Sequence, residues 1–119
     1  MSDETFMWEI MVPTERRVDG KPITTRFHRA WDAKVRAISG GLTVMKPALG
    51  QWVCPEGELY RERMIPVRFL ATVDQMNHIV DMTAVNYDQL AVLCYAVGSN
   101  VVMRTLDDAK ANLRKRKAA

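Results

Sequence analysis

Residues 24–41 read TTRFHRAWDAKVRAISGG, and residues 5–12 before them read TFMWEIMV. In the earlier stretch, alternate residues share one face and are apolar, which predicts a strand with that face in the core. In the later stretch, large apolar residues recur at helical spacing. Either Thr24 or Thr25 can cap this helix, and Gly40-Gly41 predicts its end. The fold therefore opens with a strand and a helix, joined by an arm that turns at Asp19-Gly20.

Further strands and a second helix follow in an order that predicts the architecture. The predicted strands are residues 42–45, 51–54 with a hairpin partner at 58–61, 65–71, 90–97 and 101–104. Thr72 and Gln75 have the spacing of a capping box and begin a second helix, and Thr105 with Asp108 can cap a short last one. The almost entirely apolar run at 90–97 is typical of a central strand.

This order predicts a ferredoxin-like α+β fold, the β-α-β-β-α-β motif, with an extra hairpin and a C-terminal strand. Right-handed crossovers place both helices on one face of the sheet. We expect residues 1–105 to form a single α+β domain and residues 106–119 to form a basic C-terminal helix or tail.

Composition narrows the function classes. The chain has 119 residues, of which 48% are hydrophobic and 26% charged, as in an ordinary globular domain. The acidic start and the lack of a long apolar run predict a cytoplasmic protein with no membrane segment. Cys54 and Cys94 are predicted to be buried thiols that form no disulfide, and with only two histidines we expect no metal and no cofactor. No phosphate loop or nucleophile elbow occurs, so a non-enzymatic protein is favoured.

The sheet face opposite the helices is the main candidate site. Met7, Met11 and Leu70 would lie on it with either Leu93 or Tyr95, which is too apolar for a face in contact with water. We predict a homodimer with facing sheets, the alternative being a cover made by the C-terminal helix. Glu9 and Arg68 become neighbours there if their strands are adjacent, either as an ion pair that fixes the register or as ligand-binding residues in a dimer cleft.

Other residue patterns each allow two interpretations. His28, Asp32 and Arg36 are spaced by four on the first helix, away from Trp31, which fits a solvated helix face or a general base. A second group consists of basic residues around the arm and the start of the helix, which fit a solvated loop or a site for a small anion: Arg16, Arg17, Lys21, Arg26 and Arg29.

Two patterns remain. Trp52 and Tyr60, with Arg63, fit either a stacking platform for an aromatic ligand or a hairpin packed on its own tryptophan. Residues 106–119 carry five basic and two acidic side chains, whereas the rest of the chain is balanced. This tail fits either a solubilising end or a segment that binds nucleic acid or an acidic partner through unspecific charge.

The segments Gly41-Leu42-Thr43-Val44, Gly50-Gln51-Trp52 and Glu62-Arg63-Met64-Ile65-Pro66-Val67 resemble a family of small uncharacterised bacterial and bacteriophage proteins. The resemblance extends from about residue 8 to residue 104. It implies a compact α+β domain carried by a phage or mobile element, with no activity and no site residues to transfer. We therefore expect an oligomeric binding or interaction module, such as a phage-encoded host-interaction or counter-defence protein, that binds a protein or a small anionic ligand. The alternatives are a small enzyme with its site in the dimer cleft and a nucleic-acid accessory protein.

Overall fold

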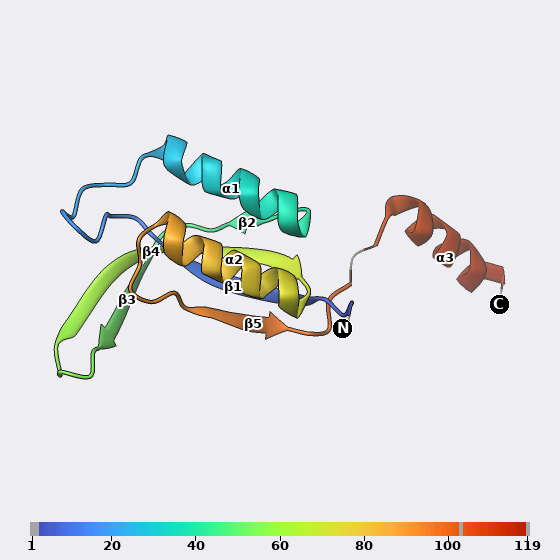
Figure 1. The fold of residues 1–119 in the computed structure, drawn as a ribbon. Helices are drawn as coiled ribbons and strands as arrows, with labels where there is room; N and C mark the ends of the chain where they lie inside the picture. Colours follow the sequence, from blue (N-terminus) through green and yellow to red (C-terminus); the bar gives the residue numbers. More distant parts are fainter. Residues whose placement is uncertain (1–2, 103, 119) are drawn as a thin grey trace.

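The computed structural model describes residues 3–102 and 104–118 and has one antiparallel sheet with three helices (Figure 1). The strands are β1 (Phe6–Pro13), β2 (Thr43–Val44), β3 (Ala48–Val53), β4 (Leu59–Ala71) and β5 (Cys94–Gly98), and the helices are α1 (Thr25–Ser39), α2 (Val73–Asn86) and α3 (Leu106–Ala118). The sheet order is β2-β4-β1-β5, with β3 paired to β4. The predicted ferredoxin-like α+β fold is confirmed.

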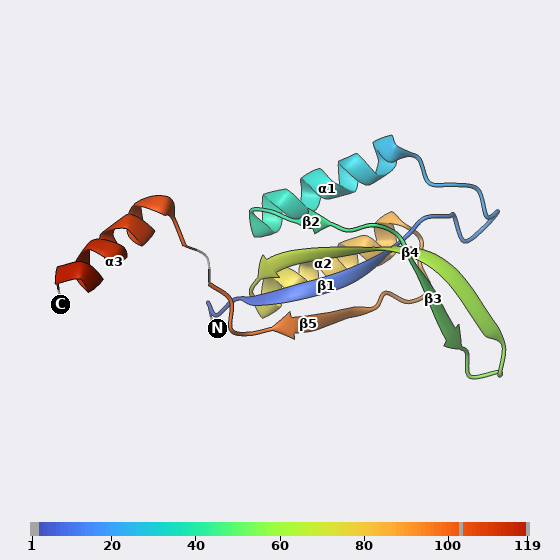
Figure 2. The same ribbon diagram turned by 180° about the vertical axis from the view of Figure 1, so that it is seen from behind.

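The helices α1 and α2 begin and end where the sequence signals place them. Thr24 caps α1, its hydroxyl accepting a hydrogen bond from the Phe27 amide, and Gly40 ends the helix at φ +89°. In α2, Thr72 and Gln75 form both bonds of the predicted capping box. Both helices lie on the same face of the sheet, as predicted (Figures 1 and 2).

The core lies between these helices and β1 and β4. Trp31 and Ile79 face Ile10 and Phe69, and all four side chains are fully buried. The indole nitrogen of Trp31 donates a 2.9 Å hydrogen bond to the hydroxyl of Thr83, which is also buried and links α1 to α2. The core holds no unpaired buried side-chain nitrogen or oxygen among the residues described.

The hairpin is larger than predicted. We predicted separate strands at 58–61 and 65–71, but β4 runs without interruption through 13 residues. Pro66 does not interrupt this strand. It has no N–H to donate, but its carbonyl still accepts a hydrogen bond from the Met45 amide. Among the described residues, positions 59–63 of β4 pair with β3 alone, so the β3–β4 hairpin projects beyond the body of the sheet (Figure 1).

Two predictions for the C-terminal part are wrong. Residues 90–97 do not form a central strand: β5 starts at Cys94 and is an edge strand paired with β1 alone. An apolar run fits a buried centre or an uncovered edge equally well, and this topology places the last strand at the edge. Residues 101, 102 and 104 form no strand, since the sheet ends at β5 and these residues lie between β5 and α3; Met103 lies outside the described residues.

The last helix is separate from the sheet. The predicted cap of α3 is present, with the Thr105 hydroxyl accepting a bond from the Asp108 amide. None of its described side chains is buried, and both views show it beyond the N-terminal start of β1 (Figures 1 and 2). The helix therefore does not cover the sheet. A cover made by this helix was our alternative to a cover made by a second copy of the chain.

Candidate functional site

The sheet face without helices, which we call the open face, carries Met7, Glu9, Met11, Arg68, Leu70, Tyr95 and Val97. These residues share a face because partners directly opposite each other in adjacent strands point the same way, and alternate residues along a strand do too. Figure 2 shows β1, β4 and β5 in front of α2, with no helix over them. The predicted uncovered face is thus present in the single chain.

Glu9 is the centre of a polar cluster on this face. It lies on β1 directly opposite Arg68 of β4 and Tyr95 of β5. Arg68 Nε donates a 2.8 Å hydrogen bond to Glu9 Oε1, and the Tyr95 hydroxyl donates to Oε2. Only 8% of the Glu9 side chain is exposed, against 42% for Arg68. The condition that the strands of Glu9 and Arg68 be adjacent is met, and Tyr95 completes the cluster.

The cluster keeps the Glu9 carboxylate ionised. The bond from Tyr95, and then the bond from Arg68, lower the pKa of Glu9 below its ordinary value, and both outweigh burial, which acts in the opposite direction. The same bond raises the pKa of Tyr95, because the phenol must stay protonated to donate. Both carboxylate oxygens have a donor, so the cluster can be covered by another surface without leaving a charge unpaired.

The hairpin extends the open face and adds apolar surface on both of its sides. Trp52 lies opposite Tyr60, on the side continuous with the open face, and their rings stack with centroids 4.9 Å apart. On the other side, Leu49, Val53 and Leu59 are 66%, 63% and 52% exposed. Because the hairpin points away from the helices, a single copy of the chain cannot bury this second side.

The chain as a whole exposes more surface than a compact monomer of its size. Its accessible area is 8714 Å², whereas a folded monomer of this mass is expected to expose about 6,600 Å². The radius of gyration is 17.9 Å, compared with about 13.5 Å for a compact domain of this length. The separate helix α3 accounts for part of this excess area of roughly 2,100 Å², and exposed side chains on the hairpin and on β5 contribute to the rest.

The row on α1 is the solvated face that we considered only at Arg36, which is exposed, whereas His28 and Asp32 are partly buried. His28 is half-buried, and its Nδ1 is 2.7 Å from the hydroxyl of Tyr87, beyond the end of α2. Burial lowers the pKa of His28, although the negative charge of Asp32 acts in the opposite direction. Burial also raises the pKa of Tyr87, which stays protonated. His28 and Asp32 border a crevice of about 40 Å³ that Trp31 lines too, so they do not lie away from Trp31.

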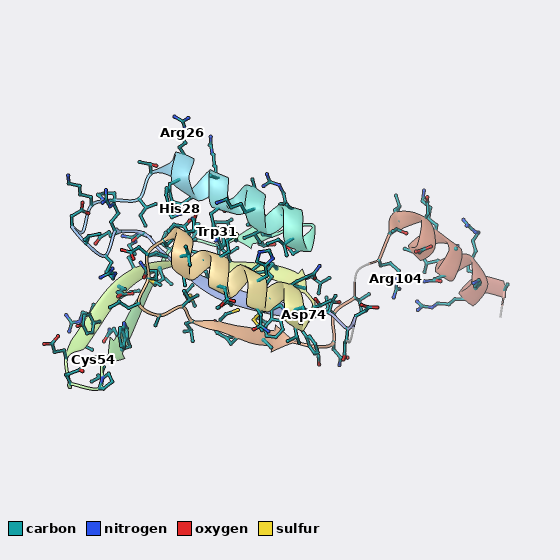
Figure 3. All side chains as sticks on the ribbon, in the orientation of Figure 1. Arg26, His28, Trp31, Cys54, Asp74 and Arg104 are labelled. Atoms are coloured by element: carbon teal, nitrogen blue, oxygen red, sulfur yellow. The ribbon has the colours of Figure 1, made fainter. Side chains whose placement is uncertain are left out.

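The predicted basic group around the arm divides into two parts. Arg16, Arg17 and Lys21 line a cavity beside Tyr87, while Arg26 and Arg29 are exposed on α1 and do not line it. Figure 3 shows Arg26 pointing outward from the helix. Sequence spacing did not separate the two parts, because it does not show how the arm folds back against α1.

The described residues contain no group of three His, Cys, Asp or Glu side chains that could hold a metal ion. Cys54 and Cys94 are free thiols, but both are half-buried and not buried as predicted; burial raises the pKa of Cys94 to about 11. In the same residues, we find no helix long and apolar enough to cross a bilayer.

Comparison with known proteins gives a likeness in structure but not in sequence. No family model matches the chain, and no curated protein matches it significantly. Among solved structures, it is similar to CutA from Xylella fastidiosa, with a TM-score of 0.62 and 9% identity over 84% of this chain and 88% of that one. It is similar to the divalent cation tolerance protein CutA1 from Thermus thermophilus, with a TM-score of 0.61 and 7% identity over 89% and 92% of the two chains.

A third similar structure is a phage SAM lyase in complex with S-methyl-5′-thioadenosine, with a TM-score of 0.62 and 12% identity over 87% of this chain and 88% of that one. These chains match this one over most of its length, including the ferredoxin-like core. The likeness establishes that the chain has the fold shared by the CutA proteins and this phage lyase.

Proposed function

We propose that the chain is a self-associating, non-enzymatic binding module whose open face and β3–β4 hairpin pack against a second copy. The observation that carries this proposal is the uncovered apolar hairpin, on which Leu49, Val53 and Leu59 are 66%, 63% and 52% exposed. The total area of 8714 Å² exceeds the expectation for a compact monomer by roughly 2,100 Å², and the separate helix α3 accounts for part of this excess. Stable protein interfaces bury about 800 Å² on each partner, so the hairpin and the open face need to supply only the remaining part.

The distribution of apolar side chains favours the hairpin of one copy on the open face of another. The hairpin side that carries Leu49, Val53 and Leu59 has no cover within its own chain. The open face offers Met7, Met11 and Leu70 as a partner surface. A homodimer remains our prediction for the smallest closed assembly. The mass of the assembly in solution gives the number of copies.

Within such an interface, Glu9, Arg68 and Tyr95 would act as a polar anchor. Both carboxylate oxygens of Glu9 already accept a hydrogen bond in the single chain. Covering them therefore leaves no unpaired charge, and their fixed geometry disfavours a shifted arrangement of the two copies. The same cluster, left at the edge of the interface, offers Arg68 to an anionic ligand or an acidic protein surface.

A matched pair of variants tests the association. Leu59 on the hairpin and Leu113 on α3 are 52% and 55% exposed. Leu59→Glu should raise the dissociation constant of self-association by about tenfold or more, because it places a charge in the proposed interface. Leu113→Glu should leave this constant unchanged. Sedimentation velocity over a range of concentrations measures both. Equal effects of the two changes, or no effect of either, would refute the proposed surface.

As a biological setting, we propose a phage-encoded protein that acts on a host protein. The support is the resemblance to small bacterial and phage proteins and a fold shared with a phage enzyme. Expression of the chain in a host strain should change the plating efficiency of a phage that lacks it, and Leu59→Glu should abolish the change. If the variant acts as well as the original chain, the assembly is not the active form.

A second candidate is a small enzyme whose site is the Glu9 cluster. The observation that favours it is an ionised carboxylate next to a tyrosine hydroxyl and an arginine, on the fold of a phage SAM lyase. Incubation of the chain with S-adenosylmethionine should then yield S-methyl-5′-thioadenosine, detected by liquid chromatography, and Glu9→Gln should stop the reaction. Absence of the product with the original chain would rule out this activity.

A further inference from the structure

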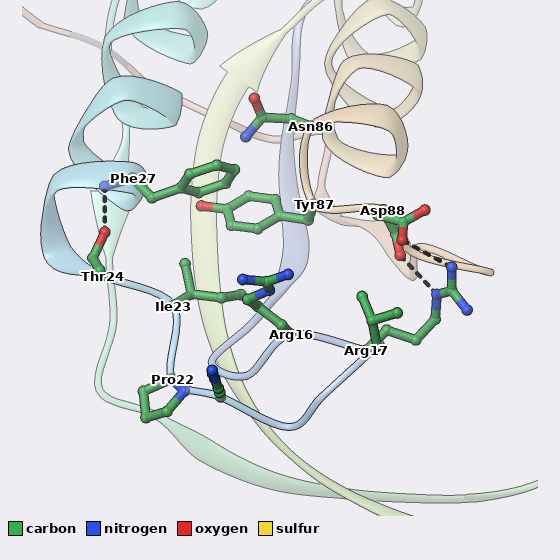
Figure 4. A pocket seen from close by; sticks show the side chains of 11 residues that line it. Arg16, Arg17, Pro22, Ile23, Thr24, Phe27, Asn86, Tyr87 and Asp88 are labelled. Atoms are coloured by element: carbon green, nitrogen blue, oxygen red, sulfur yellow. Dashed lines mark hydrogen bonds and ion pairs between the residues drawn. The ribbon is translucent and has the colours of Figure 1, made fainter.

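A cavity of about 450 Å³ lies between the arm, the start of α1 and the end of α2, away from the open face (Figure 4). We call it the arm pocket. Its lining consists of Arg16, Arg17, Val18, Lys21, Pro22, Ile23, Thr24, Phe27, Asn86, Tyr87 and Asp88. This volume is within the range of pockets that bind small organic molecules.

One wall of the arm pocket is aromatic and rigid. Phe27 and Tyr87 meet edge to face, with ring centroids 5.2 Å apart. Tyr87 is 5% exposed and is held from behind by the hydrogen bond of its hydroxyl to His28. Figure 4 shows both rings side by side above Ile23. A flat apolar ring can therefore pack on a surface that needs no rearrangement.

The other wall, formed by the arm, is positively charged. Arg16, Arg17 and Lys21 face a single acidic lining residue, Asp88. Arg17 is used to close the arm: its Nε donates to the Asp88 carbonyl at 2.9 Å and its Nη2 to the carboxylate at 2.8 Å. Asp88 adopts φ +51°, a conformation that aspartate tolerates better than most residues.

Two cations of the arm are left for a ligand. Within the described part of the chain, the Arg16 side chain has one ion pair, a long contact of 3.6 Å to Asp19, and it is more than half exposed. The Lys21 amine has no hydrogen bond or ion pair in the described residues. The first turn of α1, next to Lys21, has no acidic side chain, so the partial positive charge of the helix start is not neutralised there.

We infer that the arm pocket binds a small aromatic anion, of the size of a nucleoside monophosphate or smaller. The ring would pack on Phe27 and Tyr87, and the anionic group would lie between Arg16 and Lys21. A cation is disfavoured by the charge of the arm, and a neutral apolar molecule would leave both cations unused. The site lies within one chain and does not depend on self-association, so it can be tested separately from the proposed assembly.

Isothermal titration calorimetry with four probes tests the inference: adenosine 5′-monophosphate, 4-hydroxybenzoate, adenosine and inorganic phosphate. The two aromatic anions test phosphate against carboxylate, and the other two probes carry the ring or the anion alone. At least one aromatic anion should bind about tenfold more tightly than both adenosine and phosphate, since ring and charge contribute together. Binding no tighter than that of phosphate alone, or none at millimolar concentration, would overturn the inference.

Variants locate the site. Lys21→Gln should weaken binding by roughly three- to tenfold through the lost charge, and Phe27→Ala by roughly two- to tenfold through the lost ring contact. Lys110→Gln on α3 removes the same charge far from the pocket and serves as the control. Circular dichroism confirms that each variant is folded. If Lys21→Gln and Lys110→Gln bind equally well, the anion does not occupy the arm pocket.

Discussion

The hydrogen bond between Trp31 and Thr83 offers the sharpest test of how the helices are held on the sheet. Thr83→Val keeps the shape of the side chain and removes its hydroxyl. The Trp31 indole nitrogen then loses its 2.9 Å acceptor in a site where the two residues are 1% and 0% exposed. A buried donor without a partner costs about 1–3 kcal/mol, so the free energy of unfolding should fall by that amount.

Urea denaturation followed by tryptophan fluorescence measures this change, with all proteins at one concentration because self-association would contribute to stability. A double-mutant cycle isolates the hydrogen bond. In a Trp31→Phe background there is no indole N–H to satisfy, so Thr83→Val should cost less by about 1 kcal/mol or more. The same cost in both backgrounds would show that the bond does not link the helices, and the reasoning would fail.

Four further predictions concern single sites and the tail. Unfolding free energy should fall as the pH is lowered through about 6.5, because the unfolded chain protonates His28 more readily than the folded one, whose pKa is lowered; His28→Gln should flatten this slope in denaturation curves. Glu9 stabilises the fold above its ordinary pKa of 4.5 and loses this effect as the pH falls through its lowered value; Glu9→Gln should cost about 1–2 kcal/mol at neutral pH and remove that acid dependence. Gly40→Ala should cost about 1 kcal/mol at φ +89°, whereas Gly41→Ala, with open space and no positive φ, should cost less in thermal melts. Deletion of residues 106–119 should change the unfolding free energy by less than about 0.5 kcal/mol, since no described side chain of α3 is buried; salt-dependent DNA binding, where it occurs, should be lost with the deletion.

Most of the fold could be predicted from local signals. The threonine caps of α1 and α2, Gly40 and the alternation in β1 each act over a few residues, so the sequence carries them directly. Strand position in the sheet is decided by pairing between distant segments. This is why an apolar run at 90–97 predicted a central strand, while Cys94–Gly98 lies at the edge.

The candidate sites could be predicted only in part. Alternation placed Glu9 and Arg68 on the same face, but their contact and that of Tyr95 depend on the register of three strands. The partnership of His28 with Tyr87 spans 59 residues and joins two helices, so helical spacing suggested a solvated row instead. The arm pocket depends on how the Asp19-Gly20 turn folds back onto the end of α2, which no local signal encodes.

In the proposed assembly, a second copy of the chain covers the open face and the hairpin. Light scattering coupled to size-exclusion chromatography, applied to the 119-residue chain from micromolar to high micromolar concentration, measures the mass directly. We expect a mass at least twice the 13.6 kDa of one chain. A single species with the mass of one chain at the highest concentration would contradict the claim.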